Sequence, residues 1–154
     1  KHLVDEVNKL GLKFGIWMEP EMISPDSELY RKHPDWAFAV PERTATLSRN
    51  QYVLDLSRKE VRDYVYECVH NVISSANIEY VKWDMNRQLS EVGNEVFPPE
   101  RQREIWHRYV LGKSALLTIS QIFCLRTARA VVQDLTLACF TTVRRYGAPM
   151  TRMP

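Results

Sequence analysis

The stretch "IEYVKWDMNRQ", residues 78–88, predicts a strand that ends in a dense group of charged and amide side chains. In a strand, successive side chains point to opposite faces, so Lys82 and Asp84 share one face, while Trp83 and Met85 share the other. Charged groups packed this closely at a strand end are costly to hold unless they are paired or used. The stretch is therefore either a solvated turn or a functional site.

Strands and helices alternate along the chain around this stretch. This pattern predicts βαβ units, a parallel sheet and an α/β fold, with any chemistry at the carboxyl ends of the strands. Three units do not distinguish a barrel from an open sheet. The predicted elements are helices over residues 1–10, 24–33, 58–76 and 99–112 and strands over residues 13–21, 51–56 and 78–85.

Capping residues predict where these helices begin and end. Ser24, followed by Pro25 and acidic residues, predicts the start of one helix, and Ser57 predicts the cap of the next. Gly112 predicts the end of the last helix. The helix over 58–76 has an apolar stripe that consists of Val61, Val65, Cys68, Val69 and Val72.

Composition is that of an ordinary globular protein. The 154 residues are 45% hydrophobic and 26% charged, and no apolar run is long enough to span a bilayer. The N-terminus has no apolar signal region. Three cysteines without metal-ligand spacing indicate a reducing compartment, so we expect a cytoplasmic protein with no membrane partner.

Charge is distributed unevenly. Residues 1–112 have 15 Lys and Arg against 18 Asp and Glu, whereas residues 113–154 have six basic residues and one acid. A basic C-terminal arm for nucleic acid is one interpretation. The basic residues are scattered among apolar stretches, however, so we expect no nucleic-acid partner.

Two other acidic stretches end predicted strands. In "WMEPE", Trp17 and Glu19 share a face, and an aromatic ring beside acids suits a sugar. Structural roles for both residues are equally compatible with the sequence. At the next strand Arg49 precedes the apolar run, and Asp55, two residues before Ser57, is typical of the start of a helix.

Cofactor and metal sites are not predicted. The four histidines lie on predicted helices or their ends without ligand spacing, so we expect no zinc site. No P-loop and no G-x-G-x-x-G occurs, which disfavours a nucleotide cofactor.

Three segments in order resemble the alpha-galactosidases of glycoside hydrolase family 36. They are "FGIWMEPEMISPDSELYRKHPDW", "RNQYVLDLSRKEVRDYV" and "YVKWDMNR", and the resemblance covers residues 1–112. It implies part of a (β/α)8 TIM barrel, retaining hydrolysis of α-linked galactose from melibiose- and raffinose-type sugars, no cofactor and a homo-oligomeric full-length enzyme.

Individual roles are implied by the same motifs. Asp84 matches the family's nucleophile, and Lys82 beside it would keep the carboxylate ionised. The residues that match the family's galactose-binding segments are Trp17, Arg49, Lys82, Trp83, Met85 and Asn86.

The sequence departs from the family after Gly112. The family's general acid/base would lie in a segment resembling "QIWCADDTDA", which residues 113–154 do not contain. Back-translated with a one-base shift, "RYGAPMTRMP" (residues 145–154) can encode that segment. We therefore expect residues 113–154 to be an irregular, out-of-frame tail.

Two alternatives to a galactosidase stay open. One is a raffinose-synthase-like transglycosylase with the same nucleophile and a different acceptor pocket. The other is a non-catalytic fragment, since the chain lacks the acid/base, and we expect these 154 residues alone to be inactive.

Overall fold

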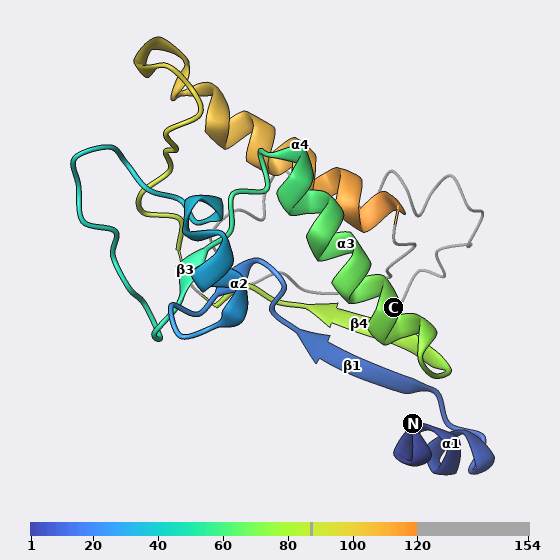
Figure 1. Cartoon of the computed structure of the whole chain (residues 1–154). Coiled ribbons are helices and arrows are strands. Elements are labelled where there is room, and N and C mark those ends of the chain that lie inside the picture. Colours follow the sequence, from blue (N-terminus) through green and yellow to red (C-terminus); the bar gives the residue numbers. More distant parts are fainter. Residues whose placement is uncertain (87, 120–154) are drawn as a thin grey trace, which may run out of the picture.

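The computed structural model describes residues 1–86 and 88–119. Helices and strands alternate along the chain, which confirms the predicted α/β class (Figure 1). In chain order the elements are α1 (His2–Lys9), β1 (Phe14–Met18), β2 (Met22–Ile23), α2 (Glu28–Lys32), the 3-10 helix η1 (Pro34–Trp36), β3 (Tyr52–Val53), α3 (Lys59–Ser74), β4 (Ile78–Trp83), the 3-10 helix η2 (Pro99–Arg101) and α4 (Glu104–Ile119).

Strands β1 and β4 form a parallel pair that carries the predicted site. Their register sets Trp17 beside Lys82, one position before the end of each strand. A glycine is required in β1, because a Cβ at Gly15 would lie 2.6 Å from the Tyr80 ring. The crossover between the strands contains α3, so β1, α3 and β4 form one βαβ unit.

The strand predicted over residues 51–56 differs from the expectation of a third parallel strand. Only Tyr52–Val53 form a strand, and they pair antiparallel with β2 in a separate two-stranded sheet. A short apolar run does not specify its partner, because pairing depends on distant chain. The described residues therefore hold one parallel βαβ unit, and the parallel pairing predicted for the strand at residues 51–56 is wrong.

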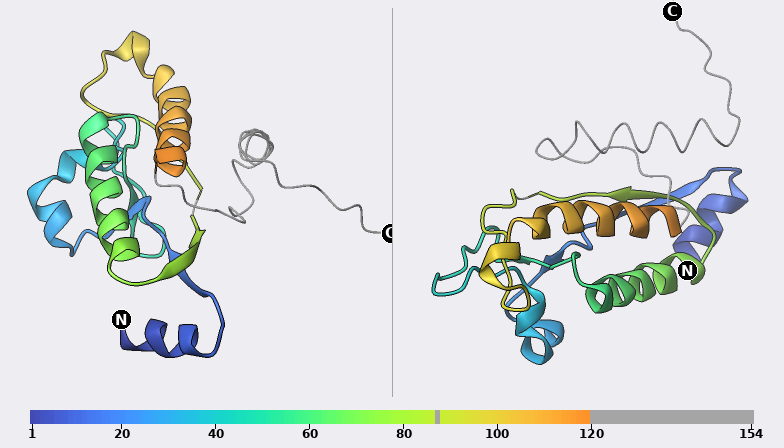
Figure 2. Two further views of the ribbon diagram at one scale, coloured as in Figure 1. Left: turned by 90° about the vertical axis from the view of Figure 1, so that its right-hand side faces the viewer. Right: turned by 90° about the horizontal axis from the view of Figure 1, so that it is seen from above.

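Helices α3 and α4 lie together on one side of the β1–β4 pair (Figure 2). The apolar stripe of α3 is confirmed for Val61, Val65 and Val69, which are buried at a spacing of four residues, whereas Cys68 is exposed. Burying one such aliphatic side chain contributes about 1.5–3 kcal/mol. The core consists of Ile23, Ala37, Phe38, Val53, Leu54, Leu56, Val61, Val65, Val69, Trp83, Met85, Ile105, Tyr109 and Leu116.

The predicted helix caps are wrong at two positions. Helix α2 begins after Ser27, whose hydroxyl accepts the Tyr30 N–H at 3.1 Å, and Ser24 forms the preceding turn instead. Helix α3 follows Arg58, which makes no side-chain cap, and the Ser57 hydroxyl has no partner among the described residues. Before α2, Ser24 and Ser27 both satisfy the local cap pattern, so the sequence does not choose between them.

Helix α4 does not end at Gly112 as predicted; it continues to Ile119. The glycine has a packing role, because a Cβ there would lie 2.1 Å from the Leu56 carbonyl oxygen. Lys113 and Leu116, beyond the predicted boundary, are both buried. The tail predicted over residues 113–154 thus begins within α4, and residues 120–154 lie outside the described part of the chain.

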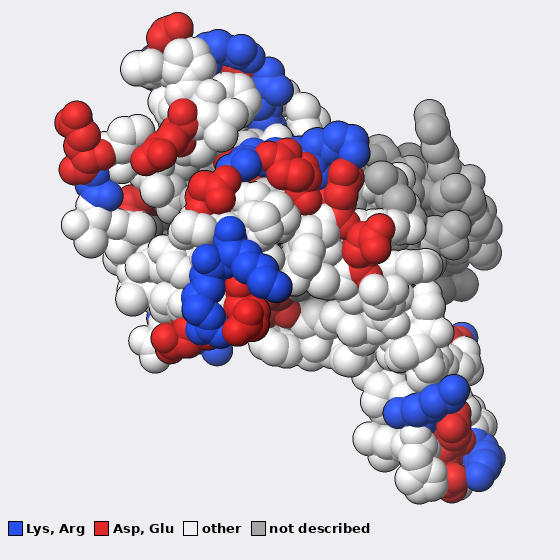
Figure 3. Space-filling model, in the orientation of Figure 1, with Lys and Arg blue, Asp and Glu red and all other residues white. Residues whose placement is uncertain are grey.

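Acidic and basic side chains are interspersed over the face shown in Figure 3, including the projecting helix α1. Such mixing is typical of a solvated surface. None of the helices in the described part of the chain is long and apolar enough to cross a bilayer.

Candidate active site

Asp84 follows directly on the end of β4. Its backbone N–H donates to the Met18 carbonyl oxygen at 2.9 Å and so extends the pairing with β1 by one step. The residue is only 6% exposed. One carboxylate oxygen, Oδ1, accepts the Met85 backbone N–H at 3.0 Å. The carboxylate is therefore fixed by backbone at a parallel-strand end, where catalytic groups of α/β enzymes are built.

Three side chains converge on the other carboxylate oxygen, Oδ2 of Asp84. The Trp17 indole N–H donates at 3.0 Å, the Asn86 amide nitrogen lies at 3.2 Å and the Lys82 ammonium at 3.7 Å. The hydrogen bond from Trp17 is the largest cause that lowers the pKa of Asp84 below its ordinary value; burial opposes it, and Met85, Asn86 and Lys82 add to it. Asp84 is an ionised carboxylate at neutral pH, as a nucleophile requires.

The predicted partner Lys82 is thus present, but its contribution is smaller than that of Trp17. The Trp17 indole N–H is within hydrogen-bond distance of the carboxylate, whereas the Lys82 ammonium, at 3.7 Å, is too far to donate a hydrogen bond to it. The hydrogen bond from Trp17 to Asp84 depends on the register of β1 against β4, which alternation within one strand does not specify. Trp17 is also 48% exposed, so a large part of its ring is free to contact a ligand.

Glu19, just after β1, links two more predicted residues. Its Oε1 accepts the Asn86 backbone N–H at 3.2 Å and the Asn86 amide at 2.5 Å. The Arg49 guanidinium lies 3.5 Å from the same oxygen. Trp17, Arg49, Lys82 and Asn86 therefore gather around two carboxylates, those of Glu19 and Asp84.

Arg49 lies at the tip of a tight turn with an unusual backbone. Arg49 and Asn50 have φ values of 55° and 57°, and Ser48 and Gln51 pair across them. Positive φ at both central residues is what a type I′ turn requires, and it is uncommon for an arginine. Such strain persists only when the surroundings hold it, and it concentrates at functional sites.

Trp83 and Met85 lie on the opposite face, as alternation predicted, and are buried in the core. The Trp83 indole N–H donates to Glu21 Oε1 at 2.7 Å, and the Tyr109 hydroxyl contacts the Met85 sulfur at 3.7 Å. The side chains of these two predicted binding residues therefore lie apart from the group around Asp84, and Met85 contacts Asp84 only through its backbone N–H.

A buried ionic group on this core side was not predicted from the sequence. Glu21 is 0% exposed; it accepts from Trp83 and from the Tyr109 hydroxyl, and Lys113 Nζ lies 2.5 Å from its Oε1. Burial is the largest cause that raises the pKa of Tyr109 above its ordinary value. By alternation along a strand, Glu21 would lie on the same face as Trp17. Strand β1 ends at Met18 and the chain then turns, so the alternation does not extend to Glu21.

Asp55 has the predicted helix-start contact and a second one. Its Oδ1 accepts the Ser57 backbone N–H at 2.9 Å, and its Oδ2 accepts the Asn94 amide at 2.5 Å. Burial raises the pKa of Asp55 above its ordinary value. Asp55 therefore anchors the loop after β4 to the start of α3 and is a structural group.

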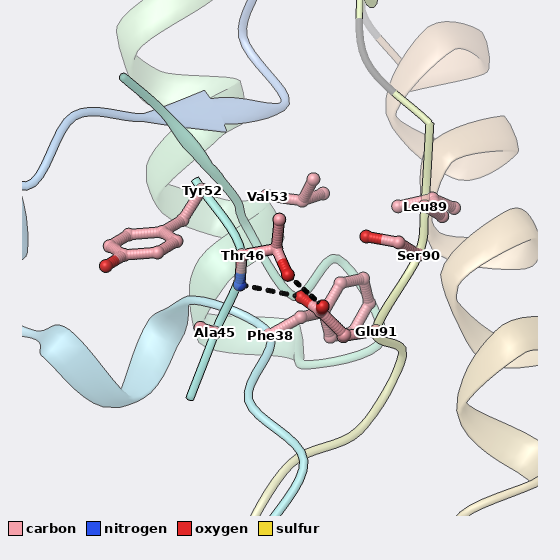
Figure 4. A pocket seen from close by; sticks show the side chains of 8 residues that line it. All are labelled: Phe38, Ala45, Thr46, Tyr52, Val53, Leu89, Ser90 and Glu91. Carbon is pink, nitrogen blue, oxygen red and sulfur yellow. Dashed lines mark hydrogen bonds between the residues drawn. The ribbon is translucent and has the colours of Figure 1, made fainter. Parts of the chain in front are cut away.

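A small pocket lies apart from Asp84, between the loop before β3 and the loop after β4 (Figure 4). Glu91 joins the two loops, since its carboxylate accepts the Thr46 backbone N–H at 2.8 Å and also contacts the Thr46 hydroxyl. The pocket is lined by Phe38, Ala45, Thr46, Tyr52, Val53, Leu89, Ser90 and Glu91.

Metal-ligand geometry is absent from the described residues, where no three His, Cys, Asp or Glu side chains come together. The donors on Asp84 are N–H groups and an ammonium. These donors hold the Asp84 carboxylate in place as a hydrogen-bond acceptor, so any reaction of that carboxylate would be with a bound ligand.

Comparison with known proteins gives a consistent family. A sequence model of the Melibiase family matches residues 1–123. Alpha-galactosidase AgaA of Geobacillus stearothermophilus is 61% identical over 110 residues, which are 71% of this chain and 15% of AgaA. Alpha-galactosidase Mel36A of Lactobacillus acidophilus is 53% identical over 116 residues, 75% of this chain and 16% of that protein. The chain thus spans about a sixth of the length of these relatives.

Solved structures agree. The GH36 alpha-galactosidase AgaA superposes with a TM-score of 0.76 at 52% identity, over 82% of this chain and 18% of that one. A variant of AgaA in complex with raffinose superposes with a TM-score of 0.74 at 53% identity, over 80% of this chain and 18% of that one. The fold of the described residues is therefore that of a segment of these enzymes.

Proposed function

This chain belongs to the Melibiase family, and we propose that it is the nucleophile-bearing segment of a retaining alpha-galactosidase with a (β/α)8 barrel. The observation that carries this proposal is Asp84, an ionised carboxylate fixed at the end of β4 beneath a half-exposed tryptophan. The relatives of this chain are alpha-galactosidases, and we take the proposed substrate class from them.

In the proposed reaction, an Asp84 oxygen attacks the anomeric carbon of galactose. The bond from that carbon to the glycosidic oxygen breaks, and a second carboxylic acid, from outside residues 1–112, gives its proton to the leaving oxygen. Water then attacks the same carbon, returns a proton to that second residue and releases Asp84. Two displacements retain the configuration.

The substrates we propose are raffinose-type α-galactosides. Structures of AgaA variants hold raffinose and stachyose. In this chain the exposed part of the Trp17 ring offers a surface for the C–H face of a sugar, and Arg49, Lys82 and Asn86 offer hydrogen-bonding groups beside Asp84.

A test of the proposed nucleophile needs a whole barrel. In a hybrid enzyme, residues 1–112 replace the matching segment of AgaA; a shorter exchange of residues 14–94 serves if the longer one does not fold. We expect the hybrid to hydrolyse p-nitrophenyl α-galactoside. Asp84→Asn should lower kcat by at least about a thousandfold because no other group forms the covalent bond. Asp63→Asn, an exposed aspartate on α3, is the matched control.

Two results would contradict this proposal: a folded hybrid without turnover, or an Asp84→Asn hybrid that keeps more than a tenth of the activity. A transglycosylase is the alternative. It predicts that added sucrose diverts galactose from water to a trisaccharide, which product analysis detects. The 154-residue chain alone should show no turnover, because it spans about a sixth of its relatives.

We also propose that a change of reading frame underlies the predicted tail of residues 113–154 and begins after the family match, which ends at residue 123. Support comes from the change in charge after Gly112 and from the fact that residues 145–154 can be back-translated into codons that read "QIWCADDTDA" in the shifted frame. The gene sequence tests this directly. Codons at residues 145–154 that do not encode "QIWCADDTDA" in the shifted frame would refute it.

A further inference from the structure

Glu19 has no assigned role, yet it contacts two of the proposed galactose-binding residues. Its side chain is nearly buried between the ends of β1 and β4. Oε1 is within 3.5 Å of three nitrogen atoms: the Asn86 backbone, the Asn86 amide and Arg49 Nη1. Because the two Asn86 contacts are the shorter ones, Glu19 acts chiefly on Asn86.

The two carboxylates fix the orientation of the Asn86 amide. Its nitrogen lies 2.5 Å from Glu19 Oε1 and 3.2 Å from Asp84 Oδ2. An ionised carboxylate only accepts hydrogen bonds, so a flipped amide would set its carbonyl oxygen against two acceptors. Both amide hydrogens are therefore donated inward. Among the described residues the carbonyl oxygen has no donor, which leaves it to accept from a ligand hydroxyl.

We propose that Glu19 is a positioning residue that orients the Asn86 amide as an acceptor for a galactose hydroxyl. This inference rests on the proposed function. Glu19 itself does not contact the sugar in this arrangement. Its effect on binding passes through Asn86, and Arg49 lies 3.5 Å from the same carboxylate oxygen.

An ordinary ion pair between Glu19 and Arg49 is the competing explanation. Arg49 is more than half exposed and 3.5 Å away, and such exposed pairs contribute little. Hydrogen bonds from both the backbone and the side chain of one residue are a more restrictive arrangement. The two explanations differ in whether the effects of Glu19 and Asn86 are independent.

A double-mutant cycle in the hybrid enzyme separates them. Glu19→Ala and Asn86→Ala are each expected to raise KM about tenfold with kcat changed less than about threefold, since a charge-assisted hydrogen bond is lost from substrate binding. The double variant should be no more than about twofold worse than Asn86→Ala alone. Glu28→Ala, which removes an exposed glutamate paired with Arg31, is the matched control and should leave KM unchanged.

If the two effects multiply, KM of the double variant rises roughly hundredfold. That result would overturn the inference, although the hybrid would still hydrolyse its substrate. So would a fall in kcat without a change in KM, because Glu19 would then act on the reaction directly. A folded wild-type hybrid without turnover would instead overturn the proposed function. If Glu19→Ala does not fold, Glu19→Gln, which keeps one acceptor oxygen, and Glu19→Asp take its place. An unchanged KM in both of these variants overturns the inference.

Discussion

Replacing Lys113 by methionine tests the buried ionic group. Lys113 is 3% exposed and Glu21 is 0% exposed, and 2.5 Å separates Nζ from Oε1. Methionine has a similar length and no charge, so the Glu21 carboxylate would stay buried with only the Trp83 indole and the Tyr109 hydroxyl as donors. Breaking a buried pair from one side costs about 3–5 kcal/mol.

We expect a loss near the lower end, about 3 kcal/mol of the free energy of unfolding, because two neutral hydrogen bonds remain. This is a large fraction of the stability of an ordinary domain, about 5–15 kcal/mol. Adding Glu21→Gln to Lys113→Met removes the charge but keeps an acceptor oxygen for Trp83 and Tyr109. The double variant should return to within about 1 kcal/mol of the unmodified chain.

Urea unfolding of the 154-residue chain measures these differences, with tryptophan fluorescence and circular dichroism as two probes of one transition. Lys9→Met is the matched control. It breaks a lysine–glutamate pair at 2.7 Å, but Lys9 is 70% exposed, so its cost should be under about 0.5 kcal/mol. A Lys113→Met cost below 1 kcal/mol, or no cooperative transition in the unmodified chain, would refute the buried pair.

Two further variants test the site and the packing. Trp17→Phe keeps an aromatic ring but loses the N–H that lowers the pKa of Asp84, so that pKa should rise. The acidic limb of the kcat/KM profile of the hybrid should then move to higher pH. The control Trp106→Phe, at a similarly exposed tryptophan on α4, should not move that limb. An acidic limb that stays in place would contradict this role for Trp17. Gly112→Ala should destabilise the 154-residue chain by about 1–3 kcal/mol in urea unfolding, because the new Cβ overlaps the Leu56 carbonyl oxygen; an equal or higher urea midpoint would contradict the close packing of α4.

Local patterns predicted much of the secondary structure. Helix α3 follows from its apolar spacing, and β1 and β4 follow from short apolar runs at the expected places. The run at residues 51–56 looked equivalent, yet only Tyr52–Val53 form a strand, and their partner is β2. A strand's partner depends on packing between distant segments, which a local pattern does not contain.

The candidate site shows the same division. Alternation correctly separated Lys82 and Asp84 from the core residues Trp83 and Met85. The bond from Trp17 to Asp84 and the contacts of Glu19 depend on the register of two strands, so no pattern within one strand predicts them. The left-handed turn at Arg49 was likewise not apparent, since arginine does not favour that backbone.

The parallel pairing of β1 with β4 has a consequence for the order of folding. Trp17 and Lys82 are neighbours in the sheet but lie 65 positions apart in the chain, since 82 less 17 is 65. Helices form from local contacts, whereas this pairing must first close a long loop and is intrinsically slow. The Trp17 indole and the Asp84 carboxylate therefore meet only after β4 has docked, so we expect the group around Asp84 to be among the last parts of this segment to assemble.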